Sequence, residues 1–231
     1  MPTVIPPPPG ASVAVDGCAE RFPLRRIFCV GRNYAAHARE MGSDPDREPP
    51  FFFMKPADAV LDAGPDDGAE VRYPPQTKEL HHEVELAVAL ARGGRDIPPE
   101  TALDHVFGYA TALDLTRRDL QREAKAAGRP WDFAKGFDQS APISPLRPVG
   151  AVGHASGQIW CRVDGEVRQD ATLADMIWPV ADVLAFASRS VELAPGDLFL
   201  TGTPAGVGPL FRGSRVEAGI TGLAPLALRV V

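Results

Sequence analysis

The stretch "HHEVELAVAL", residues 81–90, has the alternation of a β-strand and carries two glutamates among its apolar residues. Apolar side chains at positions 84, 86, 88 and 90 alternate with Glu83, Glu85 and two alanines. Successive side chains of a strand point to opposite faces, so Glu83 and Glu85 are predicted to share one face, beside the small alanines. Two carboxylates this close repel each other, and the pattern therefore predicts a positive group that neutralises them.

A third carboxylate follows another apolar run. In "FGYATALDLTRRDLQ", Asp114 lies where a predicted strand ends and a predicted helix begins. If this strand pairs with the one at 81–90, then Glu83, Glu85 and Asp114 converge. Oxygen-only ligands favour Mg²⁺, Mn²⁺ or Ca²⁺ over zinc. The alternative is a solvated edge strand, with an aspartate that caps a helix.

A histidine and a glutamate lie one helical turn apart in "GRNYAAHAREMG". His37 and Glu40 are three residues apart, hence neighbours on one helical face. A carboxylate that holds an imidazole raises its basicity, as in a general base. Gly31 and Gly42 bracket the segment, which suits a lid. A surface contact is the alternative for the pair, and His81 and His82 are alternative bases.

The length and composition are those of a globular protein. Its 231 residues are 45% hydrophobic and 23% charged, with a formal net charge of −6. An acidic chain is not expected to bind nucleic acid. Its apolar runs are shorter than the ~20 residues of a membrane span, and the N-terminus does not resemble a signal peptide. Three widely spaced cysteines indicate reduced thiols, so we expect a cytoplasmic protein without a membrane partner.

Short strands with frequent glycine and proline predict a strand-rich α+β fold. Strands are expected at 27–31, 51–54, 81–91, 106–113, 158–164, 197–201 and 226–231. Helices are expected at 33–42, at 116–128 with Thr116 as N-cap and Asp119 completing a capping box, and on both sides of Pro179 in 172–190. We expect residues 1–20 to form an extended arm and leading strand, and residues 21–231 to form a single domain that carries the candidate catalytic residues.

Seven blocks in order resemble the fumarylacetoacetate hydrolase family in its short, single-domain form, from about Ile27 to Val231. They are "VGRNYAAHAREMG", "PPFFFMKPADAV", "LHHEVELAV", "ALDLTRRDLQ", "PWDFAKGFD", "VDGEVRQDATLADMIW" and "PGDLFLTGTPAGVGPL". The block "HAREMGSDPDREPPFFFMKP" is most similar to bacterial fumarylpyruvate hydrolases of gentisate breakdown, a branch of aromatic catabolism. Acylpyruvases and oxaloacetate decarboxylases are similar to a lesser degree.

The resemblance implies a role for each matching residue. It implies that Glu83, Glu85 and Asp114 bind one divalent cation, Mg²⁺ or Mn²⁺, and that His37 and Glu40 form the base. It implies that Lys135 is an active-site cation. Substrate-side positions are Arg118, Gln121 and Thr203. The implied fold is a mixed β-roll with a few short helices, in a homodimer.

The implied reaction is hydrolysis of the carbon–carbon bond of a 2,4-dioxo acid, with fumarylpyruvate giving fumarate and pyruvate. Acylpyruvase or oxaloacetate decarboxylase activity is the alternative, and a non-catalytic metal-binding protein is an alternative of another class. The far carboxylate of fumarylpyruvate needs a cation, because burying it unpaired is costly. Arg32, Arg39 and Arg118 are the candidates, and Arg118 follows Asp114 by one turn.

Overall fold

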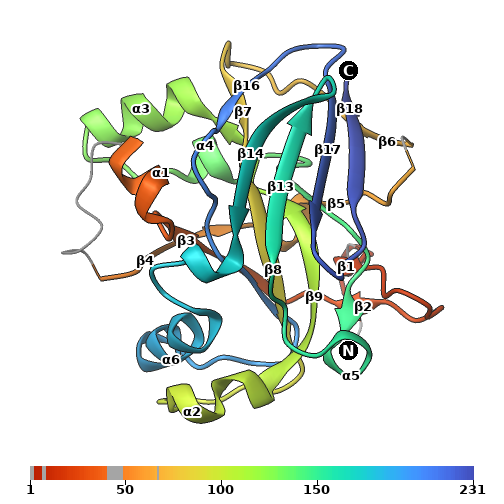
Figure 1. Cartoon of the computed structure of the whole chain (residues 1–231), viewed down its shortest axis with the longest axis vertical. Coiled ribbons are helices and arrows are strands. Elements are labelled where there is room, and N and C mark those ends of the chain that lie inside the picture. Colours follow the sequence, from red (N-terminus) through yellow and green to blue (C-terminus); the bar gives the residue numbers. More distant parts are fainter. Residues whose placement is uncertain (1–2, 7–8, 41–48, 67) are drawn as a thin grey trace.

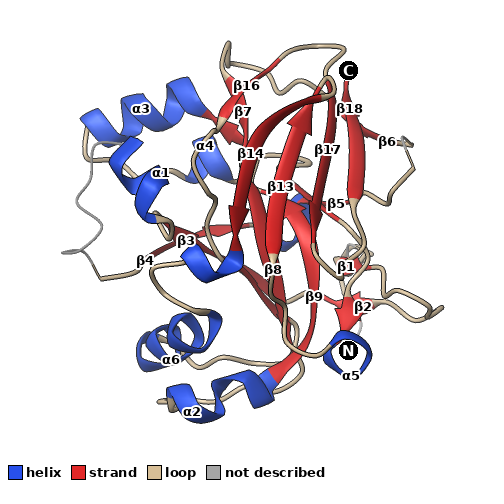
Figure 2. Ribbon diagram, viewed as in Figure 1, coloured by secondary structure: helices blue, strands red, loops and turns tan. Residues whose placement is uncertain are grey.

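The computed structural model describes residues 3–6, 9–40, 49–66 and 68–231, except the side chains of Ala38 and Glu40. In this part of the chain strands outnumber helices, and the helices are short (Figures 1 and 2). The strands are β1 (Ser12–Val13), β2 (Phe22–Pro23), β3 (Arg26–Gly31), β4 (Phe51–Lys55), β5 (Val60–Asp62), β6 (Ala69–Val71), β7 (Leu80–His82), β8 (Val84–Leu90), β9 (Val106–Leu113), β10 (Thr116–Arg117), β11 (Ala141–Ile143), β12 (Arg147–Pro148), β13 (Gln158–Val163), β14 (Glu166–Thr172), β15 (Asp197–Leu200), β16 (Gly208–Leu210), β17 (Arg215–Ile220) and β18 (Leu226–Val230). The helices are α1 (Ala35–Glu40), α2 (Pro99–Ala102), α3 (Arg118–Ala126), α4 (Asp132–Lys135), α5 (Val149–Val152) and α6 (Val180–Ser190), with 3₁₀ turns η1 (Ala57–Ala59), η2 (Leu103–His105) and η3 (Leu173–Asp175).

Strands β8 and β9 lie at the centre of the largest sheet, whose order is β4-β3-β15-β8-β9-β11-β5, with β12 beside β9. They run antiparallel, with Val84 opposite Leu113 and Glu85 opposite Ala112. The predicted strand pairing is therefore confirmed. It brings the end of β9, where Asp114 follows, next to the start of β8, where the two glutamates lie.

The two faces of β8 enter two different cores. Its large apolar side chains, such as Val84 and Leu86, pack in one cluster with residues of the second sheet, which has the order β14-β13-β17-β18-β6. Ala87 and Ala89 belong to a second cluster on the other face. Glu85 alternates with Leu86, and so it lies on the alanine-bearing face, as the alternation predicts.

The predicted strand at 81–91 is divided at Glu83, which is a correction. Residues before the break form β7 in a small separate sheet of order β10-β7-β16, and residues after it form β8. The backbone N–H of Asp114 donates to the carbonyl of Glu83 at 2.8 Å and holds the break in place. The break turns Glu83 out of the strand register while keeping it beside Asp114.

The predicted helix start at Thr116 is wrong. Thr116 pairs with His81 as part of β10, and α3 begins at Arg118 with no side-chain cap. Asp119 does not complete a capping box, because its carboxylate accepts hydrogen bonds from the Thr77 hydroxyl at 2.5 Å and the Lys78 N–H at 2.8 Å. Gly128 does follow the helix end, with a φ of 63°.

The predicted helix before Pro179 is also wrong. Only the short turn η3 forms there, and its N-cap is Thr172, whose hydroxyl accepts from the Ala174 N–H. The helix after Pro179 is confirmed as α6. The helix predicted at 33–42 is observed as α1, while its predicted end at Gly42 lies outside the described residues.

The predicted arm at residues 1–20 includes β1, which pairs with β2 across the predicted boundary. Val13 and Phe22, one on each strand, are buried against the alanine-bearing face of the main sheet. Among the described residues, no helix has both the length and the apolar character that crossing a membrane requires.

Candidate active site

Three buried carboxylates meet where β8 begins and β9 ends. One ligand atom from each of Glu83, Glu85 and Asp114 lies within 4.8 Å of the other two. The side chains are almost inaccessible, with 5%, 2% and 0% of each residue exposed. The sequence prediction that these acids converge is confirmed, although Glu83 reaches the site from the break between β7 and β8.

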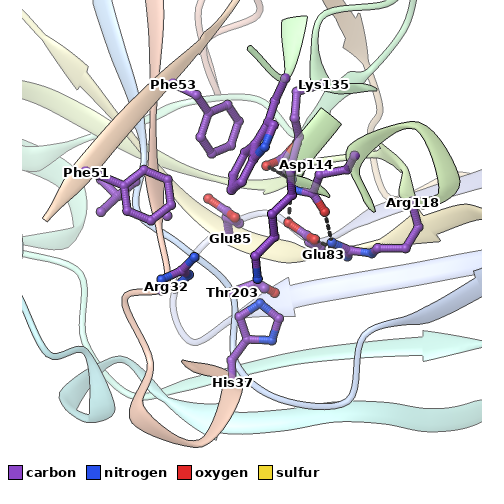
Figure 3. A pocket seen from close by; sticks show the side chains of 15 residues that line it. Arg32, His37, Phe51, Phe53, Glu83, Glu85, Asp114, Arg118, Lys135 and Thr203 are labelled. Atoms are coloured by element: carbon purple, nitrogen blue, oxygen red, sulfur yellow. Dashed lines mark hydrogen bonds and ion pairs between the residues drawn. The ribbon is translucent and has the colours of Figure 1, made fainter. Parts of the chain in front are cut away.

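Three buried cations pair with the carboxylates, and Figure 3 shows two of them, Lys135 and Arg118. The Lys135 ammonium donates to Glu83 Oε2 at 2.8 Å and to Asp114 Oδ2 at 2.6 Å. Lys55 Nζ lies 2.8 Å from Asp114 Oδ1. The Arg118 guanidinium forms an ion pair with Glu83 and donates to Gln121 Oε1 at 2.5 Å. Lys55 was not among the residues that the sequence predicted.

The surroundings shift the pKa values of Glu83 and Glu85 in opposite directions. Burial acts to raise the pKa of Glu83, but Lys135 and Arg118 outweigh it and hold that pKa well below its usual range. Burial, together with the charges of Asp114 and Glu83, raises the pKa of Glu85 well above its usual range. Glu85 accepts the Gly202 N–H at 2.7 Å, and no ion pair is found for it among the described residues. The surroundings therefore favour the protonated form of Glu85 and the ionised form of Glu83 in the metal-free protein.

A divalent cation fits this set of donors. Three carboxylates with oxygens this close provide the hard, oxygen-only ligands that Mg²⁺ and Mn²⁺ prefer. Because the acids are buried, bulk water competes little with them for the ion. The charge of the bound ion would take the place of the proton on Glu85. The residue that donates to Glu85, Gly202, can only be glycine. Its φ is 93°, and a Cβ atom added at this position would lie 2.7 Å from Asn33 Cβ.

Metal binding should therefore depend on pH. Binding releases the Glu85 proton, so the affinity for Mn²⁺ should rise by up to about tenfold per pH unit below the raised pKa. The stability of the metal-free protein should change with pH in the opposite direction. The stabilisation that comes from the Glu85 proton is present at low pH and is lost as pH rises through the folded-state pKa. Calorimetry in buffers of different ionisation enthalpy measures the released proton. Glu85→Gln is the control without a proton to release, and a pH-independent affinity would contradict the assignment.

Helix α1, which carries His37, borders the same cleft as the acids. The helix places His37 in the lining of this cleft, which opens to solvent, and all three acids line it too. His37 is 6% exposed, and its charge lowers the pKa of Glu83, which indicates that the ring is near the acids. The Glu40 side chain and Gly42 lie outside the described part of the structure. The His37–Glu40 contact and the lid therefore stay predictions.

The other predicted residues divide between this cleft and the rest of the molecule. Arg32, Arg118, Gln121, Thr203 and Lys135 line the cleft. Arg39 instead lines a separate hollow with Tyr34 and Asp170. The two alternative bases are absent from the described lining of the cleft.

His81 and His82 have other surroundings. His82 is buried, with Nδ1 3.1 Å from Gln169 Oε1, and burial lowers the pKa of its ring. Burial and the charge of Arg118 lower the pKa of His81 to about 4. Neither histidine belongs to the part of the cleft lining that the structure describes, and a ring whose pKa is lowered is a weaker base, so His37 is favoured as the candidate base.

Gln169 is a supporting residue that the sequence prediction missed. It is fully buried on β14, directly after an irregularity in the pairing of β13 with β14. Its amide nitrogen donates to Thr203 Oγ1 and to the Pro204 carbonyl, both at 2.8 Å. Its oxygen accepts the Val84 N–H at 3.0 Å. Gln169 thus fixes the Thr203 loop to the start of β8. In the sequence it is one of several polar residues in "GEVRQDA", and nothing there distinguishes it from the others.

An aromatic wall and a further lysine complete the cleft, and neither was predicted. Phe51 and Phe53 on β4 contact Trp131, with ring centroids 5.6 and 5.8 Å apart. The Arg32 guanidinium lies 5.2 Å from the Phe51 ring centroid. Lys125 on α3 also lines the cleft. Figure 3 shows Arg32 and Phe51 on the side of the cleft opposite Arg118.

Comparisons with known proteins agree with this fold. The family profile described as "Fumarylacetoacetate (FAA) hydrolase C-terminal" matches residues 26–231. The crystal structure of fumarylpyruvate hydrolase from Pseudomonas aeruginosa in complex with Mn²⁺ and pyruvate is 51% identical in sequence. It superposes with a TM-score of 0.98, over 100% of this chain and 99% of that one.

Sequence relatives have other names. Arabidopsis thaliana mitochondrial oxaloacetate tautomerase FAHD1 is 44% identical over 206 residues, which cover 89% of this chain and 90% of the relative. Dictyostelium discoideum mitochondrial oxaloacetate decarboxylase is 42% identical over 200 residues, which cover 86% and 90%.

The matches confirm the resemblance inferred from the seven sequence blocks and the strand-rich α+β fold with its few short helices. They also confirm the expectation of an enzyme that acts on carbon–carbon bonds of keto acids. The chain belongs to the fumarylacetoacetate hydrolase family.

Proposed function

We propose that this protein is a metal-dependent hydrolase that cleaves the carbon–carbon bond of a 2,4-dioxo acid, with fumarylpyruvate as its substrate and fumarate and pyruvate as its products. The observation that carries the proposal is one cleft lined both by the buried acids Glu83, Glu85 and Asp114 and by His37. The similar Pseudomonas aeruginosa fumarylpyruvate hydrolase, described with Mn²⁺ and pyruvate, supports it. The proposal includes one metal ion per chain, a cytoplasmic homodimer and a place in gentisate-type aromatic catabolism.

Glu83, Glu85 and Asp114 would hold the metal, Mg²⁺ or Mn²⁺. When bound, it supplies a Lewis acid that attracts the carboxylate and 2-oxo oxygen of the substrate and stabilises negative charge that develops on that oxygen. Lys55, Lys135 and Arg118 fix Glu83 and Asp114 in position, because each ammonium or guanidinium forms an ion pair with one of these carboxylates.

His37 is the group proposed to activate water. It takes a proton from water as the water oxygen bonds to the 4-oxo carbon. The bond between carbons 3 and 4 then breaks, its electron pair leaves with the pyruvyl half, and a proton on carbon 3 completes pyruvate. The other half leaves as fumarate, so one water is consumed for each bond cleaved. Glu40 would orient the imidazole, and such a positioned base contributes roughly 10²–10⁴-fold.

Lys135 is proposed to act as a cation and proton donor. Burial acts against its charge, but Asp114 and Glu83 outweigh burial and raise its pKa. A lysine that stays protonated is unsuited to be the base. Thr203, held by Gln169, presents its hydroxyl to the same cleft as a substrate contact.

Oxaloacetate chemistry is the second candidate, and the names of the Arabidopsis thaliana and Dictyostelium discoideum relatives favour it. Oxaloacetate has the same carboxylate and 2-oxo oxygen as the pyruvyl end of a dioxo acid. Its decarboxylation or tautomerisation needs no attack by water. The two candidates therefore share the acids and differ in their need for His37 as a water-activating base.

Product analysis with the two substrates side by side separates the candidates. With Mn²⁺ or Mg²⁺ present, fumarylpyruvate should be converted to equal amounts of fumarate and pyruvate, with a kcat/KM at least about tenfold above that for oxaloacetate. Chromatography of the products and quantification of pyruvate give both rates. A higher kcat/KM for oxaloacetate, without fumarate from fumarylpyruvate, would favour the second candidate and contradict the proposal.

A further inference from the structure

The cleft has two chemically different ends. At the inner end lie the three acids and the cations that pair with Glu83 and Asp114. The walls beyond are aromatic, formed by Phe51, Phe53 and Trp131, and two more cationic side chains, Arg32 and Lys125, line the same cleft. A ligand held by its 2-oxo acid group at the inner end would extend between the aromatic rings toward these cations.

Arg118 is not available for the far end of a substrate. Its guanidinium is bonded to Glu83 and, at 2.5 Å, to Gln121. Arg39, another sequence candidate, lines a different hollow. The first of these arginines therefore belongs to the acid cluster, and the second lies elsewhere.

Lys125, unlike these arginines, lines the cleft at a distance from the acid cluster. On α3 it follows Gln121 by four residues and Arg118 by seven, so all three side chains lie along one side of the helix, and all three line the cleft. At about 1.5 Å per residue, Lys125 lies about 10 Å along the helix from Arg118. The Lys125 ammonium has no hydrogen bond or ion pair within the part of the chain that the structure describes.

We propose that Lys125 is a specificity-determining residue, whose ammonium binds the carboxylate at the far end of the substrate. This inference rests on the proposed function, because it takes the inner end as the binding site of the 2-oxo acid group. The substrate class is then the long 2-oxo acids with a second, terminal carboxylate. Four-carbon oxaloacetate is too short to contact both the acid cluster and a lysine two helical turns away.

The surroundings strengthen such a contact. Phe51, Phe53 and Trp131 line the same cleft as the exposed Lys125, and a charge-assisted hydrogen bond is stronger than one between neutral groups. Three buried cations, Lys55, Lys135 and Arg118, lie at the inner end of the cleft in a chain that is acidic as a whole. Arg32, across the cleft, adds a positive charge on the other wall.

Two variants and two substrates test the inference. Lys125→Gln should lower the ratio of kcat/KM for fumarylpyruvate to that for acetylpyruvate, which lacks the far carboxylate, by about ten- to 150-fold. Lys125→Arg keeps the charge and should restore most of the ratio. Lys78→Gln is the matched control, because Lys78 is an exposed lysine outside the cleft, and it should leave the ratio unchanged. An unchanged ratio in Lys125→Gln would overturn the inference.

A binding measurement separates this inference from the proposed reaction. 2-Oxoadipate and 2-oxohexanoate have equal chain lengths, differ in the far carboxylate, and lack the 4-oxo group that hydrolysis needs. Calorimetry with the Mn²⁺-loaded protein should show 2-oxoadipate binding at least about tenfold more tightly, and Lys125→Gln should abolish the difference. Equal binding to the wild type would overturn the role of Lys125 even if fumarylpyruvate is cleaved. A retained difference without cleavage would contradict the reaction alone.

Discussion

Glu85→Gln is expected to lower turnover of fumarylpyruvate by at least about 10³-fold while the protein stays folded, because it removes a metal ligand and with it the charge stabilisation of the leaving group. Glutamine is neutral and nearly the same shape as the protonated glutamate of the metal-free protein. Its amide oxygen can still accept the Gly202 N–H. Thermal unfolding of the metal-free variant should therefore match the wild type, while Mn²⁺ should stabilise the wild type only.

Asp114→Asn makes a useful contrast. Asp114 is bonded to Lys55 and Lys135, and its loss leaves two buried ammonium groups without this partner. Breaking a buried ion pair in this way destabilises a protein by about 3–5 kcal/mol. Both variants should lose turnover, but only Asp114→Asn should also lose much of its stability. Wild-type turnover by Glu85→Gln, measured after chelation and return of Mn²⁺, would contradict the metal assignment.

His37→Ala is expected to lower kcat for fumarylpyruvate by roughly 10²–10⁴-fold and to leave the affinity for Mn²⁺ nearly unchanged. His37 lies in the lining of the cleft but outside the set of carboxylates that would hold the metal. Glu40→Gln should have a smaller effect in the same direction, since the glutamate acts through the imidazole. Stopped-flow kinetics and Mn²⁺ titration measure the two quantities separately.

Oxaloacetate is the internal control for the base. Any decarboxylation of oxaloacetate at the same site should be much less affected by His37→Ala, because no water is activated. Near-wild-type kcat for fumarylpyruvate in His37→Ala would show that His37 is not the base. His81→Ala and His82→Ala, which replace the two residues outside the cleft, would then be the next variants to measure.

Local sequence pattern identified the acids as candidates, and the family resemblance then favoured a metal site over a solvated edge strand. The alternation in "EVELAVAL" places Glu85 on the small-residue face, and the apolar run before Asp114 places that residue at the end of the adjacent strand. Both deductions use only the two-residue period of a strand and the tendency of neighbouring strands to pair. The break at Glu83 could not be deduced in this way, because it depends on β7 joining β10 and β16 in a different sheet.

Groups that arrive from distant parts of the chain were harder to predict. Lys55 lies 59 positions before Asp114, and Gln169 lies 85 after Val84, so no local period links these partners. Thr116 and Asp119 form a normal capping pattern, yet the first is used in β10 and the second binds the 77–78 segment. Lys125 resembles any surface lysine near a helix end until the cleft beside it is known.

Hydrolysis of fumarylpyruvate in ¹⁸O-labelled water tests the central claim most directly. The Mn²⁺-loaded protein should produce equal amounts of fumarate and pyruvate, and mass spectrometry should find one solvent oxygen in each newly formed fumarate carboxylate. The residual substrate, sampled at the same times, corrects for exchange of its ketone oxygens with water. The account predicts one labelled oxygen per bond cleaved after this correction. Consumption of the substrate without labelled fumarate, as in simple tautomerisation, would contradict it.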